Sequence, residues 1–315
     1  MTFEARPPAK VNLTLEVAGR RADGYHDLRS IFLRVGLSDR LLVEPGGADG
    51  SDRVTVTGFA VGSTRDNLVT RALQAIRLHT GVDLPALDVT LEKRIPVAAG
   101  LGGGSSDAAF ALKLATACWG VGISAAEELA LAASLGSDVP FFVADEVLAE
   151  VGGRGEIVNW LPSERLRFGV VLVTPPIALR TARVFERFDV MNPDPRSVTT
   201  AGAVASEALA GILWDEPLDD EIVAWSRDHA DSNDLWLAAS SLEPSLVALR
   251  AALEGGTGRR WLLSGSGPTL FAIYPSAREA ADAGRALAGK QLPQLQSAVM
   301  NAVDLVGPDP IWRYP

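Results

Sequence analysis

Apolar and polar residues alternate over residues 9–17, and this period of two predicts a β-strand. One face of the strand carries Val11, Leu13, Leu15 and Val17, and the other carries Lys10, Asn12, Thr14 and Glu16. The apolar face is expected to pack on a core. The polar face has two interpretations: it is solvated, as on an edge strand, or Lys10 and Asn12 share a functional surface.

Similar patterns predict strands and helices along the rest of the chain. The expected strands span residues 29–43, 52–57, 87–92, 168–174, 260–263, 269–274 and 297–305. Helices are expected over residues 107–118, 201–213, 219–229 and 277–287, and from residue 181 onward. This order indicates a mixed fold whose second half is an open antiparallel sheet with helices on one face. A domain boundary is expected at residues 156–167, and the Pro-rich tail, residues 307–315, should be poorly ordered.

Two more helices have caps that the sequence makes visible. Asp66 and Asn67 precede a helix that Gly81 should end. Ser124 and Glu127 have the spacing of a capping box and predict a helix that begins between them. These caps fix where the helices of the first half begin and end.

The stretch PVAAGLGGGSSDAA, residues 96–109, lies between a predicted strand and an Ala-rich helix, as a phosphate-binding loop does. Its glycines are Gly100, Gly102, Gly103 and Gly104. They carry no Cβ, so the backbone can take a positive φ and approach a ligand closely. Ser105 and Ser106 add hydroxyl donors or cap the helix. The alternative is an ordinary flexible turn with a Ser N-cap.

This loop matches neither of the two commonest nucleotide fingerprints. It lacks the last glycine of the dinucleotide-binding pattern and the Lys-Ser/Thr pair of a P-loop. The run GRALAGKQ, residues 284–291, comes within one residue of a P-loop, but it ends a helical segment and is interpreted as a helix C-terminus.

Composition limits the partners. The net charge is −10, and the 29 Lys and Arg residues form no basic stripe, which argues against nucleic acid. A single cysteine, Cys118, cannot form an internal disulfide and fits a reducing compartment. There is no secretory leader pattern and no apolar run of membrane length, so we expect a soluble, cytoplasmic protein with no membrane partner.

Three polar or aromatic residues on predicted loops are candidates for ligand binding. The turn at Asp23-Gly24 presents Tyr25 and His26 together, where an aromatic ring can stack on a flat ligand and an imidazole can bond to its edge. Asp138 lies among apolar neighbours just before Pro140. Its ordinary explanation is a helix N-cap.

Three separated motifs, PAKVNL at 8–13, PVAAGLGGGSSDAA at 96–109 and SGSGPTLF at 264–271, together resemble the signatures of the galactokinase, homoserine kinase, mevalonate kinase and phosphomevalonate kinase (GHMP) superfamily. GRRADGYHDL at 19–28 and GSDVPFF at 136–142 resemble the branch that phosphorylates the 2-hydroxyl of 4-diphosphocytidyl-2-C-methyl-D-erythritol in the non-mevalonate isoprenoid pathway. The resemblance covers nearly the whole chain. It implies an α+β fold of two domains: residues 1–160, a ribosomal-protein-S5-like α/β unit, and residues 161–315, a ferredoxin-like antiparallel sheet with helices.

The resemblance also implies roles for individual residues. Lys10 and Asp138 would be the catalytic pair. ATP would lie on Pro96, Val97, Ala98, Ala99, Gly100, Leu101, Gly102, Gly103, Gly104, Ser105 and Ser106, with Asn67, Leu68 and Lys93 as candidates for the adenine side. The cytidine diphosphate derivative of methylerythritol would contact Asn12, Tyr25, His26, Thr181 and Phe185, and Gly265 and Gly267 would form a turn that closes over the glycine loop.

Several points stay open at this stage. Mg²⁺ is expected with ATP, and Ser106 and Asp107 are candidate ligands, although Asp107 also suits the helix dipole. Asp138 either accepts the hydroxyl proton or orients Lys10. The protein is expected to be a monomer or a weak homodimer. Two rival functions remain: another GHMP kinase acting on homoserine, mevalonate or a sugar, and a nucleotide-binding regulator without turnover.

Overall fold

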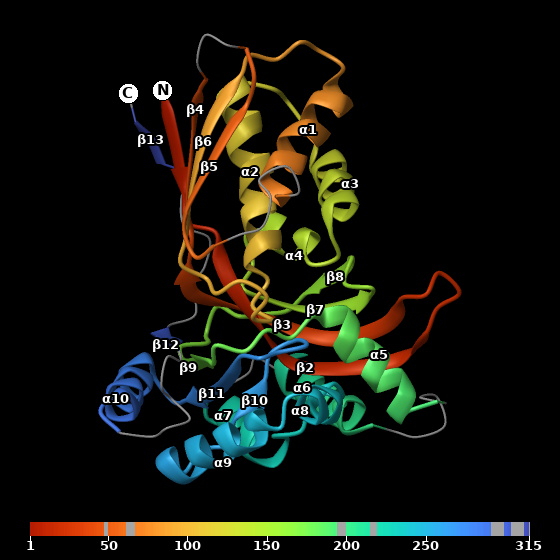
Figure 1. Cartoon of the computed structure of the whole chain (residues 1–315), viewed down its shortest axis with the longest axis vertical. Helices are drawn as coiled ribbons and strands as arrows, with labels where there is room; N and C mark the ends of the chain where they lie inside the picture. Colours follow the sequence, from red (N-terminus) through yellow and green to blue (C-terminus); the bar gives the residue numbers. More distant parts are fainter. Residues whose placement is uncertain are drawn as a thin grey trace.

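The upper part of the molecule is a five-stranded sheet with helices on one side (Figure 1). The computed structural model describes residues 1–46, 50–60, 67–193, 200–214, 219–290, 299–303 and 312–314. The sheet has the order β13-β1-β4-β6-β5. Its strands are β1 (Thr2–Ala5), β4 (Arg40–Pro45), β5 (Arg53–Gly58), β6 (Leu87–Lys93) and β13 (Trp312–Tyr314). The pair β5–β6 is parallel and the other pairs are antiparallel.

Helices α1 (Leu68–Thr80) and α2 (Gly103–Trp119) lie over one face of this sheet, and α3 (Ala125–Leu135) packs on the outer side of these two helices. The predicted caps are confirmed where the structure describes them. The Asn67 side chain accepts a hydrogen bond from the N–H of Val69, and Gly81 ends α1 in a left-handed conformation. The capping box at Ser124 is complete at α3. Asp66 lies outside the described residues.

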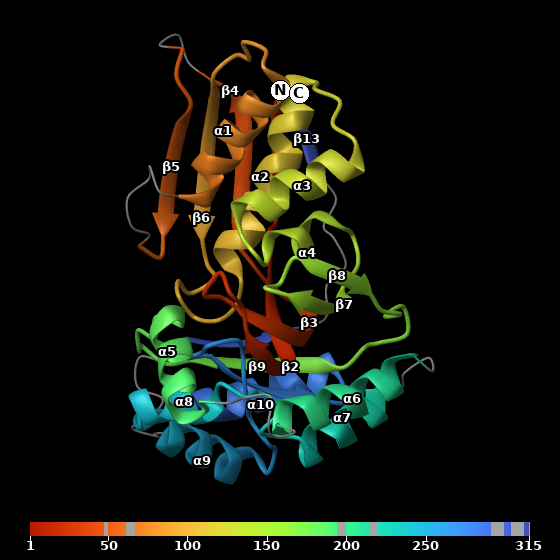
Figure 2. The same cartoon turned by 90° about the vertical axis from the view of Figure 1, so that its right-hand side faces the viewer.

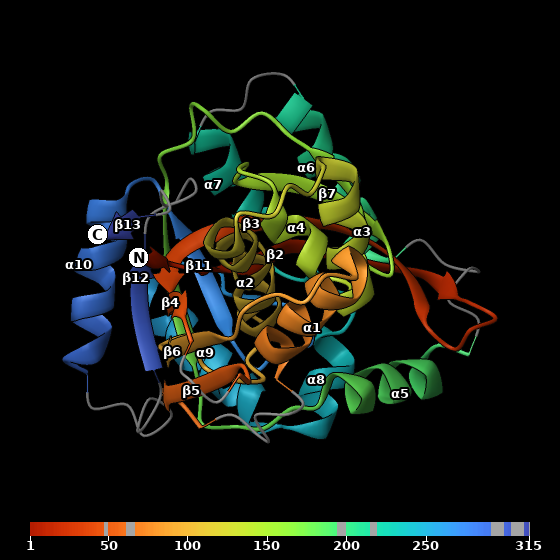
Figure 3. The same ribbon diagram turned by 90° about the horizontal axis from the view of Figure 1, so that it is seen from above.

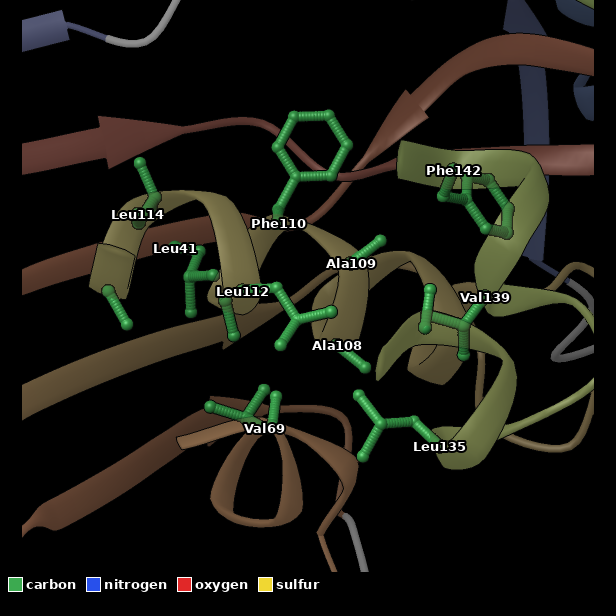
Figure 4. Packing of buried hydrophobic residues seen from close by; sticks show 14 of the residues in the cluster. Leu41, Val69, Ala108, Ala109, Phe110, Leu112, Leu114, Leu135, Val139 and Phe142 are labelled. Carbon is green, nitrogen blue, oxygen red and sulfur yellow. The ribbon is translucent and has the colours of Figure 1, made fainter. Parts of the chain in front are cut away.

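The core of the upper part is built on α2. Helix α2 is apolar on nearly every side because it is covered by α1, α3, the sheet and the short helix α4 (Val139–Val143). Figure 4 shows Ala108, Ala109, Phe110 and Leu112 of α2 surrounded by side chains of the other elements. The small alanines let the neighbouring helices approach closely.

A second sheet, β2-β3-β7-β8, crosses the middle of the molecule (Figure 2). Its strands are β2 (Pro8–Arg20), β3 (His26–Ser38), β7 (Leu148–Gly153) and β8 (Ile157–Trp160). Strand β2 lies at the edge of this sheet, but the interpretation of its polar face as solvated is wrong, because Lys10, Asn12 and Thr14 are all buried. The expected strand over 29–43 is two strands, which meet at the buried Asp39.

The lower part contains the third sheet, β10-β11-β9-β12, which is antiparallel throughout. Its strands are β9 (Gly169–Thr174), β10 (Leu262–Leu263), β11 (Leu270–Tyr274) and β12 (Val299–Val303). The accompanying helices are α5 (Thr181–Met191), α6 (Ala201–Trp214), α7 (Asp219–Asp228), α8 (Trp236–Leu242), α9 (Ser245–Thr257) and α10 (Ala277–Ala288). Along β9, Val170 and Leu172 join the core shared with β2 and β3, whereas Val171 and Val173 pack with residues of α9 and α10.

The stretch 156–167, where a domain boundary is expected, contains β8, and the boundary itself stays a prediction. Two parts of the sequence-based picture need correction. The expected disordered tail contains β13, whose backbone pairs with β1. Figure 3 shows β13 beside the N-terminus. Helices α8 and α9 and strands β7 and β8 were not predicted.

The run GRALAGKQ that resembles a P-loop is a helix end, as predicted, since Gly289 caps α10. Gln291 of this run lies outside the described residues. No helix in the described ranges is long and apolar enough to cross a membrane.

The α1–α2 interface gives a test of the upper core. Leu73 is fully buried, and we expect Leu73→Ala to lower the free energy of unfolding by about 2–5 kcal/mol through lost burial and a cavity. Leu78 on the same helix is exposed, so Leu78→Ala should change it by less than about 0.5 kcal/mol. Urea denaturation of both variants measures the difference. Equal effects would contradict the packing described here.

Candidate active site

A cavity of about 610 Å³ lies where β2 and β3, the glycine loop and the start of α5 meet. Most of the residues singled out from the sequence line it: Lys10, Asn12, Asn67, Leu68, Lys93, Pro96, Val97, Ala98, Ala99, Gly100, Leu101, Gly102, Gly103, Gly104, Ser105, Asp138, Thr181, Phe185 and Gly265. Ser106, Tyr25, His26 and Gly267 are not part of its lining in the described chain. One cavity therefore brings together residues that are far apart in the sequence.

The backbone of the glycine loop is left-handed at Ala98, Gly100 and Gly102, with φ of 54°, 78° and 69°. Gly102 is the N-cap of α2 and has no side chain to cap it, so the first N–H groups of the helix are free to face the cavity. The helix begins at Gly103, four residues before the expected start. Ser105 and Ser106 lie inside its first turn, so the alternative in which a serine caps the helix is wrong.

The left-handed glycines are required by close contacts as well as by φ. A Cβ on Gly100 would collide with the carbonyl oxygen of Ser264. A Cβ on Gly102 would lie 3.0 Å from Cγ of Lys10 and 3.1 Å from the ring of Phe142. Gly100 therefore lets the loop meet the turn that follows β10, and Gly102 lets it meet the side chain of Lys10.

That turn lies directly against the glycine loop. The Ser264 hydroxyl donates to the carbonyl of Gly100 over 2.9 Å, and the amide of Thr269 donates to the carbonyl of Ala99 over 3.3 Å. Asn233 secures the turn from behind, because its Nδ2 donates to the carbonyls of Leu263 and Gly265. Gly265 and Gly267 have φ of 55° and 82°, which supports the expected glycine turn.

The side chains of Lys10 and Asp138 form an ion pair at the floor of the cavity. The Lys10 ammonium lies 3.5 Å from Oδ2 of Asp138 and donates to Oδ1 of Asn12 over 2.6 Å. It also lies 4.3 Å from the centre of the Phe32 ring. Burial lowers the pKa of Lys10, while the neighbouring carboxylate of Asp138 acts in the opposite direction.

The structure does not support Asp138 as a simple helix cap. Asp138 precedes α4, but its side chain makes no capping hydrogen bond. The α4 helix is instead held by Arg34, which lies opposite Lys10 on β3 and donates to the carbonyls of Phe141 and Ala144. Burial lowers the pKa of Arg34 to about 10. The Asp138 carboxylate is thus available to the cavity and to Lys10.

Aromatic residues border the other end of the cavity, on α5. Phe185 lines it, and the ring of His26 stacks on Phe185 with 4.8 Å between centroids. Nε2 of His26 is paired with Asp189 over 2.6 Å. Tyr25 does not line the cavity of the described chain: the residue is 56% exposed and its ring lies 5.1 Å from the guanidinium of Arg154, so its contact with the cytosine ring stays a prediction. Thr181 also lines the cavity and bonds to Ser266.

Lys93 has a different environment from the one expected on the adenine side. Its ammonium is buried between the carboxylates of Asp39 and Asp107. Burial acts to lower the pKa of Lys93, but the two carboxylates outweigh it and raise the pKa above its usual value. Two of the three N–H donors of Lys93 are therefore engaged by buried carboxylates. Asn67 and Leu68, at the start of α1, line the cavity.

Comparison with known proteins agrees with this arrangement. The family description "GHMP kinases N terminal domain" matches residues 67–146, and "GHMP kinases C terminal" matches residues 224–294. The 4-diphosphocytidyl-2-C-methyl-D-erythritol kinase of Anaeromyxobacter dehalogenans is 37% identical over 286 residues, which cover 90% of this chain and 84% of that protein. The enzyme of the same name from Heliobacterium modesticaldum is 36% identical, with 91% of both chains covered. The chain belongs to the 4-diphosphocytidyl-2-C-methyl-D-erythritol kinase family.

A solved structure of a member supports the same assignment. The crystal structure of 4-(cytidine 5'-diphospho)-2C-methyl-D-erythritol kinase matches with a TM-score of 0.71 and 33% identity, over 96% of this chain and 99% of that one. The chain is therefore a GHMP-type small-molecule kinase with an α+β fold. The resemblance based on the three motifs and on the residues around Tyr25 and Asp138 is confirmed at the level of the family.

Sequence reasoning missed several residues that complete the site in this kinase. Ser30 and Phe32 line the cavity from β3, where Phe32 lies opposite Asn12. Ser30 also accepts a hydrogen bond from Nδ2 of Asn12 over 2.9 Å, which turns Oδ1 of Asn12 toward Lys10. The pairing register of β2 and β3 would have identified them, but the sequence does not specify it.

The close contact at Gly100 is testable by a matched pair of substitutions. Gly100→Ala places a Cβ against Ser264 in a left-handed backbone, so ATP affinity should fall by about tenfold or more. In Gly289→Ala, at the end of α10 and outside the cavity lining, the new Cβ lies 3.6 Å from the carbonyl oxygen of Arg285, an ordinary contact, and ATP affinity should change less than about threefold. Calorimetric titration with ATP measures both. A larger loss in Gly289→Ala than in Gly100→Ala would show that the loop is wrongly described.

Proposed function

We propose that this chain transfers the γ-phosphoryl group of ATP to the 2-hydroxyl of 4-diphosphocytidyl-2-C-methyl-D-erythritol. The observation that carries the proposal is the Lys10–Asp138 pair, which lies in one cavity with a glycine loop before a helix N-terminus. Phosphoryl transfer needs mainly positioning and charge neutralisation, and these parts supply both. The names of the relatives supply the acceptor, since each is a kinase for that substrate.

On this proposal ATP lies with its phosphates on residues 96–106 at the N-terminus of α2. The free helix N–H groups and the left-handed loop give an anion-binding concavity. The buried Lys10 ammonium beside Gly102 would neutralise charge that develops on the transferring phosphoryl group. Asn12 holds this ammonium in place through its Oδ1.

Asp138 is proposed as the base that accepts the proton of the attacking hydroxyl. Its carboxylate is 30% exposed, so it can reach a substrate in the cavity while it stays beside Lys10. The second role, in which Asp138 only orients Lys10, uses the same contact of 3.5 Å. The two roles differ in how strongly turnover depends on the charge of Asp138.

Mg²⁺ is proposed to accompany ATP, where it would add positive charge at the phosphates. Oδ1 of Asp107 and Oγ of Ser106 are buried and make no hydrogen bond within the described residues, and oxygen donors suit this ion. These two side chains are the candidate protein ligands. The residues described here contain no cluster of three or more His, Cys, Asp or Glu that could hold a metal ion.

The acceptor is proposed to lie toward α5. Phe185 offers an aromatic face, and His26, Thr181 and Asn12 offer polar groups around it. Phe185 is proposed as an aromatic platform for the cytosine ring, and the exposed Tyr25 stays a second candidate for stacking on it. The division into residues 1–160 and 161–315, a monomeric or weakly dimeric state and a cytoplasmic location remain predictions.

Incubation of the protein with ATP and the cytidine diphosphate substrate, followed by phosphorus NMR, tests the function. A new phosphomonoester signal together with ADP is the expected result. Phosphorylation of homoserine, mevalonate or a sugar in place of this substrate would establish the related-kinase alternative. Binding of ATP with no turnover of any of these acceptors would establish the regulator.

The charge of Asp138 can be removed with little change in shape. Asp138→Asn should keep the fold and ATP affinity but lower kcat by about 10² or more, because the hydroxyl proton loses its acceptor. Asp145, which follows the other end of α4 and is exposed, is the control, and Asp145→Asn should leave kcat unchanged. Steady-state kinetics measure both variants. Near-normal turnover of Asp138→Asn would assign Asp138 to orientation alone.

The aromatic platform makes a separate prediction. Phe185→Ala should raise KM for the cytidine substrate by the equivalent of about 1–3 kcal/mol, with little effect on KM for ATP. Val190 lies on the same helix and is exposed, so Val190→Ala should leave both KM values unchanged. Initial rates at varied concentrations of each substrate give the comparison. An unchanged KM in Phe185→Ala would remove α5 from the acceptor site.

A further inference from the structure

A buried network of charges lies behind the glycine loop, outside the ion pair that the proposed chemistry uses. It consists of Asp39, between β3 and β4, Lys93 at the end of β6, and Asp107, one turn into α2. All three side chains are buried. The Lys93 ammonium donates to Oδ2 of Asp39 and, over 2.7 Å, to Oδ2 of Asp107.

This network joins the two ends of the glycine loop. At the entry, Oδ1 of Asp39 accepts the backbone N–H groups of Arg94 and Ile95 over 2.5 and 2.8 Å. At the exit, Lys93 holds Asp107, one helical turn into α2. A single carboxylate and a single ammonium thus connect the residues just before the loop with the helix just after it.

The network also determines how closely the loop packs. A Cβ on Gly103 would lie 3.2 Å from Nζ of Lys93 and 2.9 Å from Cγ2 of Ile95. Gly103 does not have a positive φ, so its backbone conformation does not require a glycine. The close contact with Lys93 and Ile95 is what leaves no room for a side chain. The first residue of α2 therefore packs against Ile95 and the ammonium of Lys93, which Asp39 holds.

We propose that Asp39 is a positioning residue for the phosphate loop, which acts through Lys93 and the amides of Arg94 and Ile95. It cannot touch a ligand itself, because its side chain is fully buried and does not line the cavity. Its role is to keep the loop in the binding-competent shape before ATP arrives, which lowers the cost of ordering on binding. The inference rests on the proposed function only for the identity of the ligand.

The chain contains a matched control at the opposite end of the same strand. Asp52 accepts the backbone N–H of Leu87, the first residue of β6, and a bidentate pair from Arg77. It is therefore also a carboxylate that holds a cation and an end of β6. Its partners do not belong to the glycine loop or to the cavity lining.

The test compares Asp39→Asn with Asp52→Asn. Amide hydrogen exchange of the protein without nucleotide should become faster over residues 96–102 in Asp39→Asn and stay unchanged there in Asp52→Asn. The dissociation constant for ATP, measured by calorimetry, should rise by about tenfold to a hundredfold in Asp39→Asn alone. KM for the acceptor should stay unchanged in both variants, because neither carboxylate faces α5.

Each outcome bears on the proposal. Equal effects of the two substitutions on exchange and ATP affinity, or an Asp39→Asn variant with native exchange over 96–102, would overturn it and leave Asp39 with a merely structural role. If Asp39→Asn does not fold, Lys93→Met is added to it, which removes the buried ammonium that only Asp107 would then neutralise, and exchange over 96–102 is read in that variant. Absence of ATP binding by the unsubstituted protein would defeat the proposed function, whereas the exchange comparison would still decide the role of Asp39.

Discussion

The site depends on the close approach of two backbones, at Gly100 of the glycine loop and Ser264 of the turn after β10. No side chain fits between them, and the Ser264 hydroxyl donates to the Gly100 carbonyl. The same hydroxyl is 3.4 Å from the amide of Asn12, so the contact joins all three motifs at one point. The loop belongs to the upper part of the molecule and the turn to the lower part (Figure 1). Any residue other than glycine at 100 would separate the parts that form the cavity.

Burial of cations is the second constraint. Lys10, Lys93 and Arg34 are almost fully enclosed, and a buried ammonium or guanidinium is costly unless acceptors surround it. The three cations differ in the acceptors that surround them. Lys10 has Asn12 and a partly exposed Asp138, which leaves one carboxylate open to a ligand. Lys93 is enclosed by two buried carboxylates, and Arg34 is paired with backbone carbonyls. Of the three, Lys10 has the environment that suits chemistry, and the other two suit support of the loop and of α4.

The sequence predicted the elements whose signals are local. Asn67 and Gly81 delimit α1, and the capping box at Ser124 opens α3, because these caps act within a few residues. Properties that depend on distant partners were not predictable. Helix α2 begins at Gly103 although glycine has a poor helix propensity, because the first turn of the helix packs on Ile95 and Lys93. Likewise β13 is specified by its pairing with β1, at the far end of the chain. Within the site, the residues of each motif were predicted individually. The Asp39–Lys93–Asp107 network was not predicted, because no sequence pattern relates its three residues.

The two-sided burial of β2 explains why the alternating pattern was ambiguous. A strand that alternates is normally solvated on its polar face, yet Lys10, Asn12 and Thr14 face the interior. Further along the strand, the backbone of Leu15 forms a bridge with Asn233, and Leu13 packs in one core with Leu172 of β9. Strand β2 is thus enclosed by elements that follow it by more than 150 residues. The predicted domain boundary lies near residue 160. Strand β2 precedes this boundary, yet it shares a core with the lower sheet, whose strands follow it. The strand that carries Lys10 and Asn12 is held from both sides, and the polar residues that a solvated edge would leave mobile are fixed in their positions at the cavity.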